Sequence, residues 1–233
     1  MSLNTFITRL SILIAFCLCS LTIYFYLFIP DTTKLEELLS EINDSDHFVP
    51  ANQIPPHVKK AFIVAEDGFF HFHQGVDYPA LMTAAKILII TGEKKYGAST
   101  ITMQLARNVY LHKRKTFTRK FNEILLAHKI EQSFTKDEIL SMYLNIIYFG
   151  HNNYGIKEAA NFYFGKSVSD LNISEGAILA SIPPAPGYTT PILKPQKILI
   201  KRNKILIKLL ALQYISPPEY CKASASLMLV DAK

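Results

Sequence analysis

An uncharged apolar run near the N-terminus, from Leu10 to Ile29, reads LSILIAFCLCSLTIYFYLFI. Its 20 residues match the length of a helix that crosses the hydrocarbon core of a bilayer. Arg9 precedes the run and Asp31 follows it, so the positive-inside rule predicts a cytoplasmic N-terminus with the remaining chain outside. The alternative is a cleaved signal peptide, whose apolar region is usually shorter and ends at small residues, whereas this run ends in bulky side chains. We therefore predict an uncleaved transmembrane anchor within residues 1–30.

The chain as a whole is basic and apolar enough to form a core. It has 233 residues, a formal net charge of +6 and 49% hydrophobic residues, which allows one moderate domain beyond an anchor and argues against disorder. A pI of about 9.1 suits a nucleic acid, an anionic membrane or a phosphorylated substrate as partner. The three cysteines, Cys17, Cys19 and Cys221, have neither the spacing of a zinc site nor that of a disulfide framework.

Beyond the anchor, residues 31–53 are polar and interrupted by proline, which indicates a tether containing a short helix. From His57 onward, apolar residues recur at spacings of three and four, the pattern of amphipathic helices. Capping-box patterns predict helix starts at Thr135 with Glu138 and at Asn172 with Glu175. We therefore predict a mostly α-helical domain over 54–215, closed by a basic helix within residues 194–215 and followed by a tail over 216–233.

The segment AEDGFFHFHQG contains two adjacent acids in apolar surroundings. Glu66, Phe70 and His73 are spaced i, i+4 and i+7, which predicts a helix that continues through this segment with the three residues on one face. Burial would raise the pKa of Glu66 and suit it to act as a general base near neutral pH. The alternative interpretation is an acid pair on the surface of an ordinary helix.

A second polar segment, GASTITMQLARN, contains Gly97 and Ser99, which indicate a loop that leads into a helix. Thr100, Gln104 and Asn108 follow at i, i+4 and i+8, with Arg107 beside them. Such a stripe suits phosphate groups and sugar hydroxyls. It is equally typical of the solvated face of an amphipathic helix.

The densest positive patch is HKRKTFTRKFNEILLA, which contains basic residues at 113–115 followed by Arg119 and Lys120. Arg119 and Glu123 are spaced i and i+4, which predicts an ion pair that keeps Glu123 ionised. Glu66 and Glu123 would then have different electrostatic environments, the usual sign of divided catalytic roles. The patch also suits contact with anionic lipid, and the two interpretations are compatible.

In this order, the segments resemble the motifs of glycosyltransferase family 51, the transglycosylase domain of class A penicillin-binding proteins and their monofunctional relatives. The first motif, E-D-x-x-F-x-x-H-x-G, is matched by Glu66, Asp67, Phe70, His73 and Gly75. The second, G-x-S-T-I-T-x-Q with a following basic residue and Asn, is matched by Gly97, Ser99, Thr100, Ile101, Thr102, Gln104, Arg107 and Asn108. The third, R-K-x-x-E, is matched by Arg119, Lys120 and Glu123.

Two further segments extend the resemblance over residues 54–206. KDEILSMYLNIIYFG at 136–150 resembles the fourth motif, and LNISEGAILASIPPAP at 171–186 resembles the fifth. The sequence departs from the family pattern at Met103, where many members have glutamine, and at Asn152, where a glycine is usual.

The resemblance implies a mainly α fold, with a lysozyme-like lobe and a small membrane-proximal jaw, preceded by one transmembrane helix. The apolar segments 87–91 and 109–111 are candidates for the jaw. It also implies an enzyme that polymerises lipid II into peptidoglycan glycan strands by inverting glycosyl transfer and releases undecaprenyl pyrophosphate. The implied location is the bacterial cytoplasmic membrane, single-pass, with the catalytic domain on the periplasmic side. The implied partners are lipid II, a lipid-linked glycan chain, the membrane and other cell-wall synthesis proteins, and not nucleic acid.

By the same resemblance, Glu66 is the general base, and Glu123 is a second catalytic residue. Glu123 would orient the neighbouring cations or hold a divalent cation, Mg²⁺ or Mn²⁺, on the pyrophosphate. The implied substrate-binding residues are Asp67, Phe70, His73, Ser99, Thr100, Gln104, Arg107, Asn108, Arg119 and Lys120. Asp67, Phe70 and His73 have a structural role as the alternative.

Three other functions compete with this interpretation. A lysozyme-like glycan hydrolase would share a catalytic glutamate but would need neither the basic patch nor the lipid anchor. A non-catalytic scaffold in wall synthesis is favoured if Asn152 disables turnover. A truncated bifunctional protein is suggested by S-x-x-K at Ser133 to Lys136, but no K-T-G follows, so we predict no penicillin binding.

Overall fold

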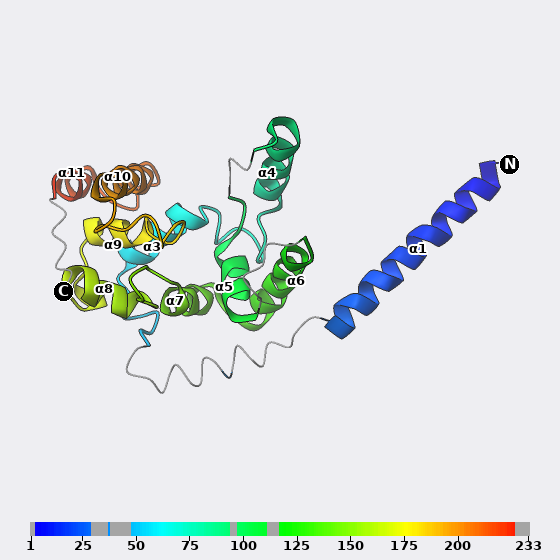
Figure 1. The fold of residues 1–233 in the computed structure, drawn as a ribbon, viewed down its shortest axis with the longest axis horizontal. Coiled ribbons are helices and arrows are strands. Elements are labelled where there is room, and N and C mark those ends of the chain that lie inside the picture. The colour runs from blue at the N-terminus through cyan, green and yellow to red at the C-terminus, as the bar shows by residue number, and fades with distance from the viewer. Residues whose placement is uncertain (1–2, 29–36, 38–47, 94–96, 111–116, 227–233) are drawn as a thin grey trace.

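The structure is a computed structural model that describes residues 3–28, 37, 48–93, 97–110 and 117–226 (Figure 1). Within these ranges the chain is helical, and the one β feature is an isolated antiparallel bridge between Tyr148 and Tyr154. The predicted mainly α class is therefore confirmed.

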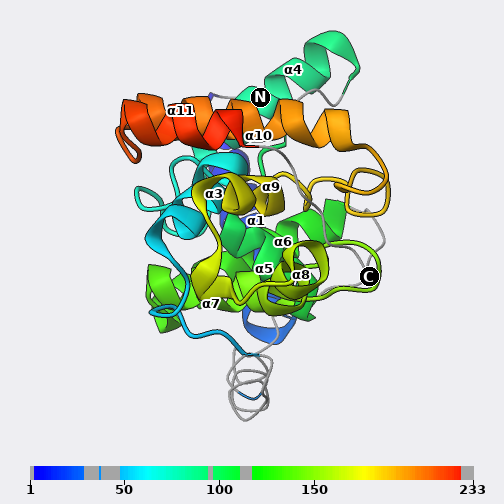
Figure 2. The ribbon, with the colours of Figure 1, turned by 90° about the vertical axis from the view of Figure 1, so that its left-hand side faces the viewer.

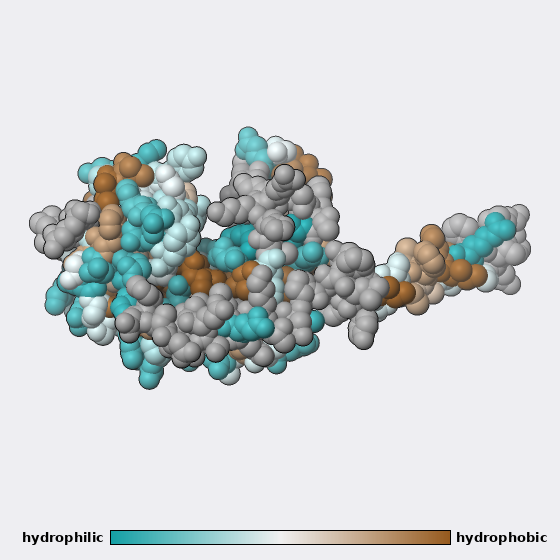
Figure 3. All heavy atoms as spheres, turned by 60° about the horizontal axis from the view of Figure 1, so that its bottom comes forward, coloured by the Kyte–Doolittle hydropathy of each residue, from teal (hydrophilic) through white to brown (hydrophobic). Residues whose placement is uncertain are grey.

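Helix α1 (Leu3–Phe28) contains the apolar run. Its described side chains are largely exposed, with Ile12 at 64% and Phe16 at 72%, and apolar residues are prominent along it in Figure 3. Counting only described residues, no helix combines the length and the hydropathy needed to cross a membrane. The transmembrane anchor thus stays a prediction, and most of the predicted tether, 29–36 and 38–47, lies outside the described residues.

One part of the domain is built on α3 (Pro56–Glu66), α9 (Ile173–Ala180) and α10 (Pro195–Ala211), which pack against one another. Close approach of α3 and α9 depends on Gly176, where a Cβ atom would lie 3.1 Å from Val58 Cγ2. Helix α11 (Pro217–Ala225) packs on α9 and α10, within the residues predicted as a tail. The short helix η1 (Val168–Asp170) precedes α9.

The other part contains α5 (Ile101–Tyr110), α6 (Phe117–Ser133), α7 (Lys136–Ile146) and α8 (Ile156–Phe164). Helix α5 packs on both α6 and α7 and is buried along one side through Ile101 and Leu105. Both predicted capping boxes are confirmed: Thr135 with Glu138 at the start of α7, and Asn172 with Glu175 at the start of α9.

Helix α4 (Tyr78–Thr91) projects away from these two groups of helices (Figure 1). It begins at Asp77, whose side chain accepts a hydrogen bond from the Ala80 amide, and ends at Gly92 in the left-handed conformation. None of its residues is buried, although its sequence is strongly apolar. Met82, Ile89 and Ile90 are 72%, 83% and 70% exposed.

The predicted helix through AEDGFFHF is wrong beyond Glu66. Helix α3 ends there, because Asp67 is extended at φ −157° and the following residues form turns. Phe70 and His73 therefore do not share a helix face with Glu66. Thr100 likewise precedes α5, so the predicted stripe of Thr100, Gln104 and Asn108 begins at a helix cap.

Asn152, which stands where the family pattern usually has glycine, has the backbone conformation that glycine favours. Asn152 has a φ of 63°, and the turn is closed by a hydrogen bond from the Asn153 amide to Gly150 O. Asparagine is among the few non-glycine residues that enter the left-handed region readily. The substitution therefore keeps the turn without a large backbone cost.

Candidate active site

Glu66, the last residue of α3, has two carboxylate oxygens in different environments. Oε2 accepts a hydrogen bond of 2.8 Å from Gln104 Nε2 on α5. Oε1 is buried and has no hydrogen-bond partner among the described residues. Burial raises the pKa of Glu66, as predicted, and the Gln104 hydrogen bond and the charges of Lys201 and Arg107 partly oppose that rise. A carboxylate of this kind is suited to accept a proton from a substrate hydroxyl.

Tyr143 on α7 supports the side chain that holds Glu66. Its hydroxyl donates to Gln104 Oε1 at 3.4 Å, which leaves the amide nitrogen of Gln104 directed at Glu66. The tyrosine is fully buried, and burial raises its pKa well above the ordinary value. Tyr143 was missed as a site residue, although it lies in the segment that resembles the fourth motif.

Glu123 on α6 is 1% exposed and is paired with two cations. Its Oε1 lies 3.1 Å from Arg119 Nε, and its Oε2 lies 3.2 Å from Lys120 Nζ. The predicted i, i+4 ion pair is thus confirmed, and Lys120 adds an i, i+3 pair. Lys120 Nζ also donates to Ser99 Oγ at 2.8 Å. The buried acid therefore holds both basic side chains in place.

The segment 99–104 connects the two glutamates. Ser99 accepts from the lysine that pairs with Glu123, while Gln104 donates to Glu66. Because Gln104 follows Ser99 by only five positions, both carboxylates lie around the start of one helix. This is an arrangement in which a single substrate can contact a proton acceptor at one end and positive charge at the other.

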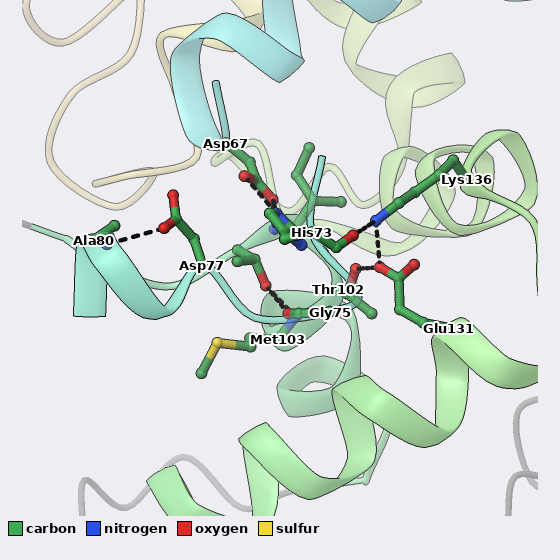
Figure 4. Close-up of polar contacts among 11 residues, drawn as sticks. Asp67, His73, Gly75, Asp77, Ala80, Thr102, Met103, Glu131 and Lys136 are labelled. Atoms are coloured by element: carbon green, nitrogen blue, oxygen red, sulfur yellow. Dashed lines mark hydrogen bonds and ion pairs between the residues drawn. The ribbon is translucent and has the colours of Figure 1, made fainter. Parts of the chain in front are cut away.

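Asp67 fixes the start of α5 next to Glu66. Its carboxylate accepts a hydrogen bond from His73 Nε2 at 3.0 Å (Figure 4). It also accepts one from the Ile101 backbone amide at 2.9 Å, and Asp67 is 6% exposed. Phe70 is fully buried. These positions favour the structural alternative for Asp67, Phe70 and His73, since each side chain is occupied inside the protein.

A second polar network, which sequence reasoning missed, joins the loop after α3 to α5, α6 and α7. Lys136 Nζ donates to His73 O and to Glu131 Oε1, both at 2.7 Å, and Glu131 Oε1 also accepts from Thr102 Oγ1 at 2.6 Å (Figure 4). The ammonium group lies 4.5 Å from the centre of the Phe70 ring. This network holds the loop 67–77 against the helices that carry Gln104 and Glu123.

The predicted polar stripe on α5 divides into two parts. Thr100 is 2% exposed and acts as a helix cap, because its Oγ1 donates to Gly75 O at 2.6 Å and accepts from the Met103 amide. Gly75 itself has a φ of 87°, and a Cβ atom there would lie 2.7 Å from Ala127 O. Arg107 is half-buried and Asn108 is exposed, so these two remain accessible to a substrate. The basic residues 113–115 lie outside the described residues.

The donor set around Glu123 does not by itself fit a divalent cation. Both of its oxygens already face positive side chains. In the described ranges, no three histidine, cysteine, aspartate or glutamate side chains converge in a way that could hold a metal ion. The Mg²⁺ or Mn²⁺ expected from the family resemblance therefore stays a prediction.

A helical domain with one half-buried glutamate of raised pKa and a second, buried and ion-paired glutamate has the features of the carboxylate-dependent enzymes that break or form glycosidic bonds. The sequence profile of the transglycosylase family matches residues 33–210. The chain belongs to the transglycosylase family.

Its relatives include large and small proteins. Penicillin-binding protein 1F of Bacillus subtilis is 44% identical over 184 residues, which cover 79% of this chain and 26% of that protein. A Cupriavidus necator protein whose name designates a transglycosylase is 41% identical over 79% of both chains. The crystal structure of Penicillin-binding protein 1A from Haemophilus influenzae aligns with a TM-score of 0.40 and 30% identity, covering 57% of this chain and 16% of that chain. The chain spans about a quarter of the Bacillus protein.

Proposed function

We propose that this chain is a peptidoglycan glycosyltransferase that polymerises lipid II into glycan strands. The observation that carries the proposal is the carboxylate of Glu66, which is held by Gln104 through one oxygen and has its other oxygen buried and without a partner among the described residues. Membership of the transglycosylase family supports the same activity.

In the proposed reaction, Glu66 takes the proton from the 4-hydroxyl of the acceptor sugar. The resulting oxygen attacks the anomeric carbon of the donor, and the bond from that carbon to the pyrophosphate oxygen breaks. One displacement inverts the anomer and releases undecaprenyl pyrophosphate, in the same way that an inverting glycosidase uses water. The proton stays on Glu66 until solvent removes it.

Positive side chains near Glu123 would stabilise the leaving group. A pyrophosphate departs with negative charge, so fixed cations help more than a proton donor would. Arg119 and Lys120 are 17% and 31% exposed at their side chains, and the buried Glu123 fixes their positions. Arg107 on α5 provides a third cation on the side nearer Glu66. Glu123 is thus a positioning residue in this scheme.

A membrane location follows from substrates that are lipid-linked. We propose that the 20-residue run at 10–29 anchors the chain in the cytoplasmic membrane, with the catalytic domain on the periplasmic side. The larger part of the domain would be the lysozyme-like lobe, and α4 would belong to the jaw, because its apolar side chains are exposed rather than packed. Other wall-synthesis proteins remain predicted partners.

Polymerisation of labelled lipid II by the purified full chain in detergent tests the proposal. Glu66→Gln is expected to abolish polymer formation, and Glu123→Gln to reduce it strongly by releasing Arg119 and Lys120. Asp137→Asn is the matched control, because Asp137 is 69% exposed at its side chain and lies on the surface.

Each outcome discriminates between the competing functions. Polymer from the parent that the glycan-chain analogue moenomycin blocks, and that Glu66→Gln lacks, supports the transferase. A folded parent that makes no polymer would favour the scaffold. Shortening of preformed glycan would favour the hydrolase.

A further inference from the structure

The charged residues of the segment around α10 are all basic. Between Glu175 and Glu219 there is no acidic residue, while six basic residues are present, namely Lys194, Lys197, Lys201, Arg202, Lys204 and Lys208. The active site accounts for one of them, since Lys201 contributes to the electrostatic environment of Glu66. The proposed reaction leaves the others unexplained.

Three of these cations form hydrogen bonds that tie α10 to the rest of the domain. Lys201 Nζ donates to Ser181 O at 2.9 Å, and Lys208 Nζ donates to Val64 O at 3.0 Å. Arg202 is 3% exposed and donates to the backbone oxygens of Ser224 and Ser226 at the end of α11. The face of α10 that packs on α9 and α3 contains Arg202 together with the buried Ile198, Ile205, Leu206 and Leu209.

The outer face of α10 consists of alternating cationic and apolar side chains. Lys197, Ile200, Lys204 and Ile207 follow one another at i, i+3, i+7 and i+10, so they lie along one side of the helix. All four are exposed, and Ile200 and Ile207 remain 58% and 54% accessible. Leu193, just before the helix, is 52% exposed. We call this set the α10 outer face.

The α10 outer face lies on the same side of the molecule as α4. In Figures 1 and 2, α10 and α4 are both at the top, whereas α7 and α8 are at the bottom. Because α10 packs on α9 and α3 below it, its outer face is directed away from the domain on that side. One side of the protein thus presents the exposed apolar residues of α4 and the lysine–isoleucine face of α10.

We propose that the α10 outer face is a second membrane contact, which binds an anionic lipid surface beside α4. Exposed lysines attract anionic headgroups, and the isoleucines between them can enter the boundary of the acyl chains, as in interfacial amphipathic helices. An acidic protein would satisfy the lysines but would give no reason for exposed isoleucines at alternate positions. The inference rests on the proposed action at a membrane, and it adds a lipid class and a surface to that proposal.

Docking through α10 would also orient the active site. Glu66 is the last residue of α3, and α3 packs on α10, so the helix that contacts the lipid also supports the helix that carries the proposed base. Contact at α10 and α4 together would fix the orientation of α3 and Glu66 relative to lipid-linked substrates.

The chain contains no tryptophan, so single tryptophans can report lipid contact in the full-length protein. Ile207→Trp and Ile200→Trp place the probe on the α10 outer face. Tyr154→Trp is the matched control, since Tyr154 is 55% exposed and precedes by two positions the helix α8, which lies on the opposite side in Figure 1. Ile14→Trp on α1 reports whether the chain is anchored at all. Each variant is reconstituted into vesicles of phosphatidylcholine alone or with phosphatidylglycerol, with bromine-labelled acyl chains as quenchers.

We expect strong quenching and a blue-shifted emission at positions 200 and 207 in vesicles that contain phosphatidylglycerol, and little at 154. Lys197→Glu with Lys204→Glu should reduce the quenching at 207 severalfold, as should raising salt from about 0.1 M to 1 M, where the screening length falls from ~10 Å to ~3 Å. Quenching at 14 with none at 200 or 207 would overturn the inference and leave the anchor intact. Quenching at none of the four positions would overturn both the α10 inference and the anchor. Equal quenching at 154 and 207 would overturn the α10 inference. None of these results depends on glycan synthesis.

Discussion

Removing the amide that holds Glu66 should move the acid limb of the pH–rate profile upward. Gln104 Nε2 donates to the Glu66 carboxylate at 2.8 Å and is the strongest influence that lowers its pKa. Gln104→Met keeps the length of the side chain and removes the donor. Because the proposed base, Glu66, can accept a proton only when it is ionised, a higher pKa means that activity is lost at a higher pH as the solution is acidified.

The size of the shift follows from the hydrogen bond. A hydrogen bond to a charged group contributes about 1.5–3 kcal/mol, and one pKa unit corresponds to about 1.36 kcal/mol. Complete loss would therefore raise the pKa by about one to two units. Glu66 is partly exposed, and water can replace some of the lost interaction, so we expect about one unit.

The assay is the dependence of kcat/KM for lipid II polymerisation on pH, because its acid limb reports the pKa of the base in the free enzyme. Tyr143→Phe is the milder perturbation: its hydroxyl reaches Gln104 only at 3.4 Å and makes no direct contact with Glu66, so its removal should shift the limb less than Gln104→Met does. An unchanged limb in Gln104→Met, with polymerisation still measurable, would refute the coupling of Gln104 to the base. A limb displaced downward would refute the identity of the base.

Three further outcomes are expected. The pKa of Glu66 is raised above 4.5 in the folded protein, so the stability that protonated Glu66 contributes is present at acid pH and is lost as pH rises through the folded pKa. Glu66→Gln should therefore raise the Tm measured by thermal denaturation at pH 7, and the gain should disappear near pH 4. A lower Tm of the variant at pH 7 would contradict this sign. Asn152→Ala should lower the free energy of unfolding, measured by urea denaturation, by about 1 kcal/mol, because alanine enters the left-handed region less readily than asparagine. Asn152→Gly should not lower it. Equal stability of the parent and both variants would argue against a left-handed residue at position 152. Mass spectrometry should detect no covalent adduct of labelled penicillin at Ser133, because Lys136 donates its hydrogen bonds to Glu131 and to His73 O rather than to that serine. An adduct would restore the bifunctional alternative.

The position of Glu66 relative to Gln104 depends on two ion pairs that involve neither Glu66 nor Glu123. The Asp67–His73 pair and the Lys136–Glu131 pair hold the loop after α3 against α5, α6 and α7. Loss of either pair would displace Glu66 relative to Gln104 without removing any group that touches substrate. Effects on kcat from such variants should therefore accompany losses of stability.

Short-range features were predictable from the sequence because they depend on spacing along one helix. The capping boxes at Thr135 and Asn172 and the Arg119–Glu123 pair needed no knowledge of the fold, since residues three and four apart meet on any α-helix. The mainly α class followed from the apolar periodicity for the same reason. The family resemblance marked which of these residues belong together.

What the sequence alone did not determine is where helices stop and which distant residues meet. Periodicity continued through AEDGFFHF, yet α3 ends at Glu66, because the carboxylate of Asp67 is bound by His73 and by the amide of Ile101, 34 residues further on. The pairing of Glu66 with Gln104 spans 38 residues and exists only once α3 and α5 are packed. Tertiary structure decided these contacts because hydrogen bonds between distant segments form only when the core has already brought their helices together, and no local pattern encodes that approach.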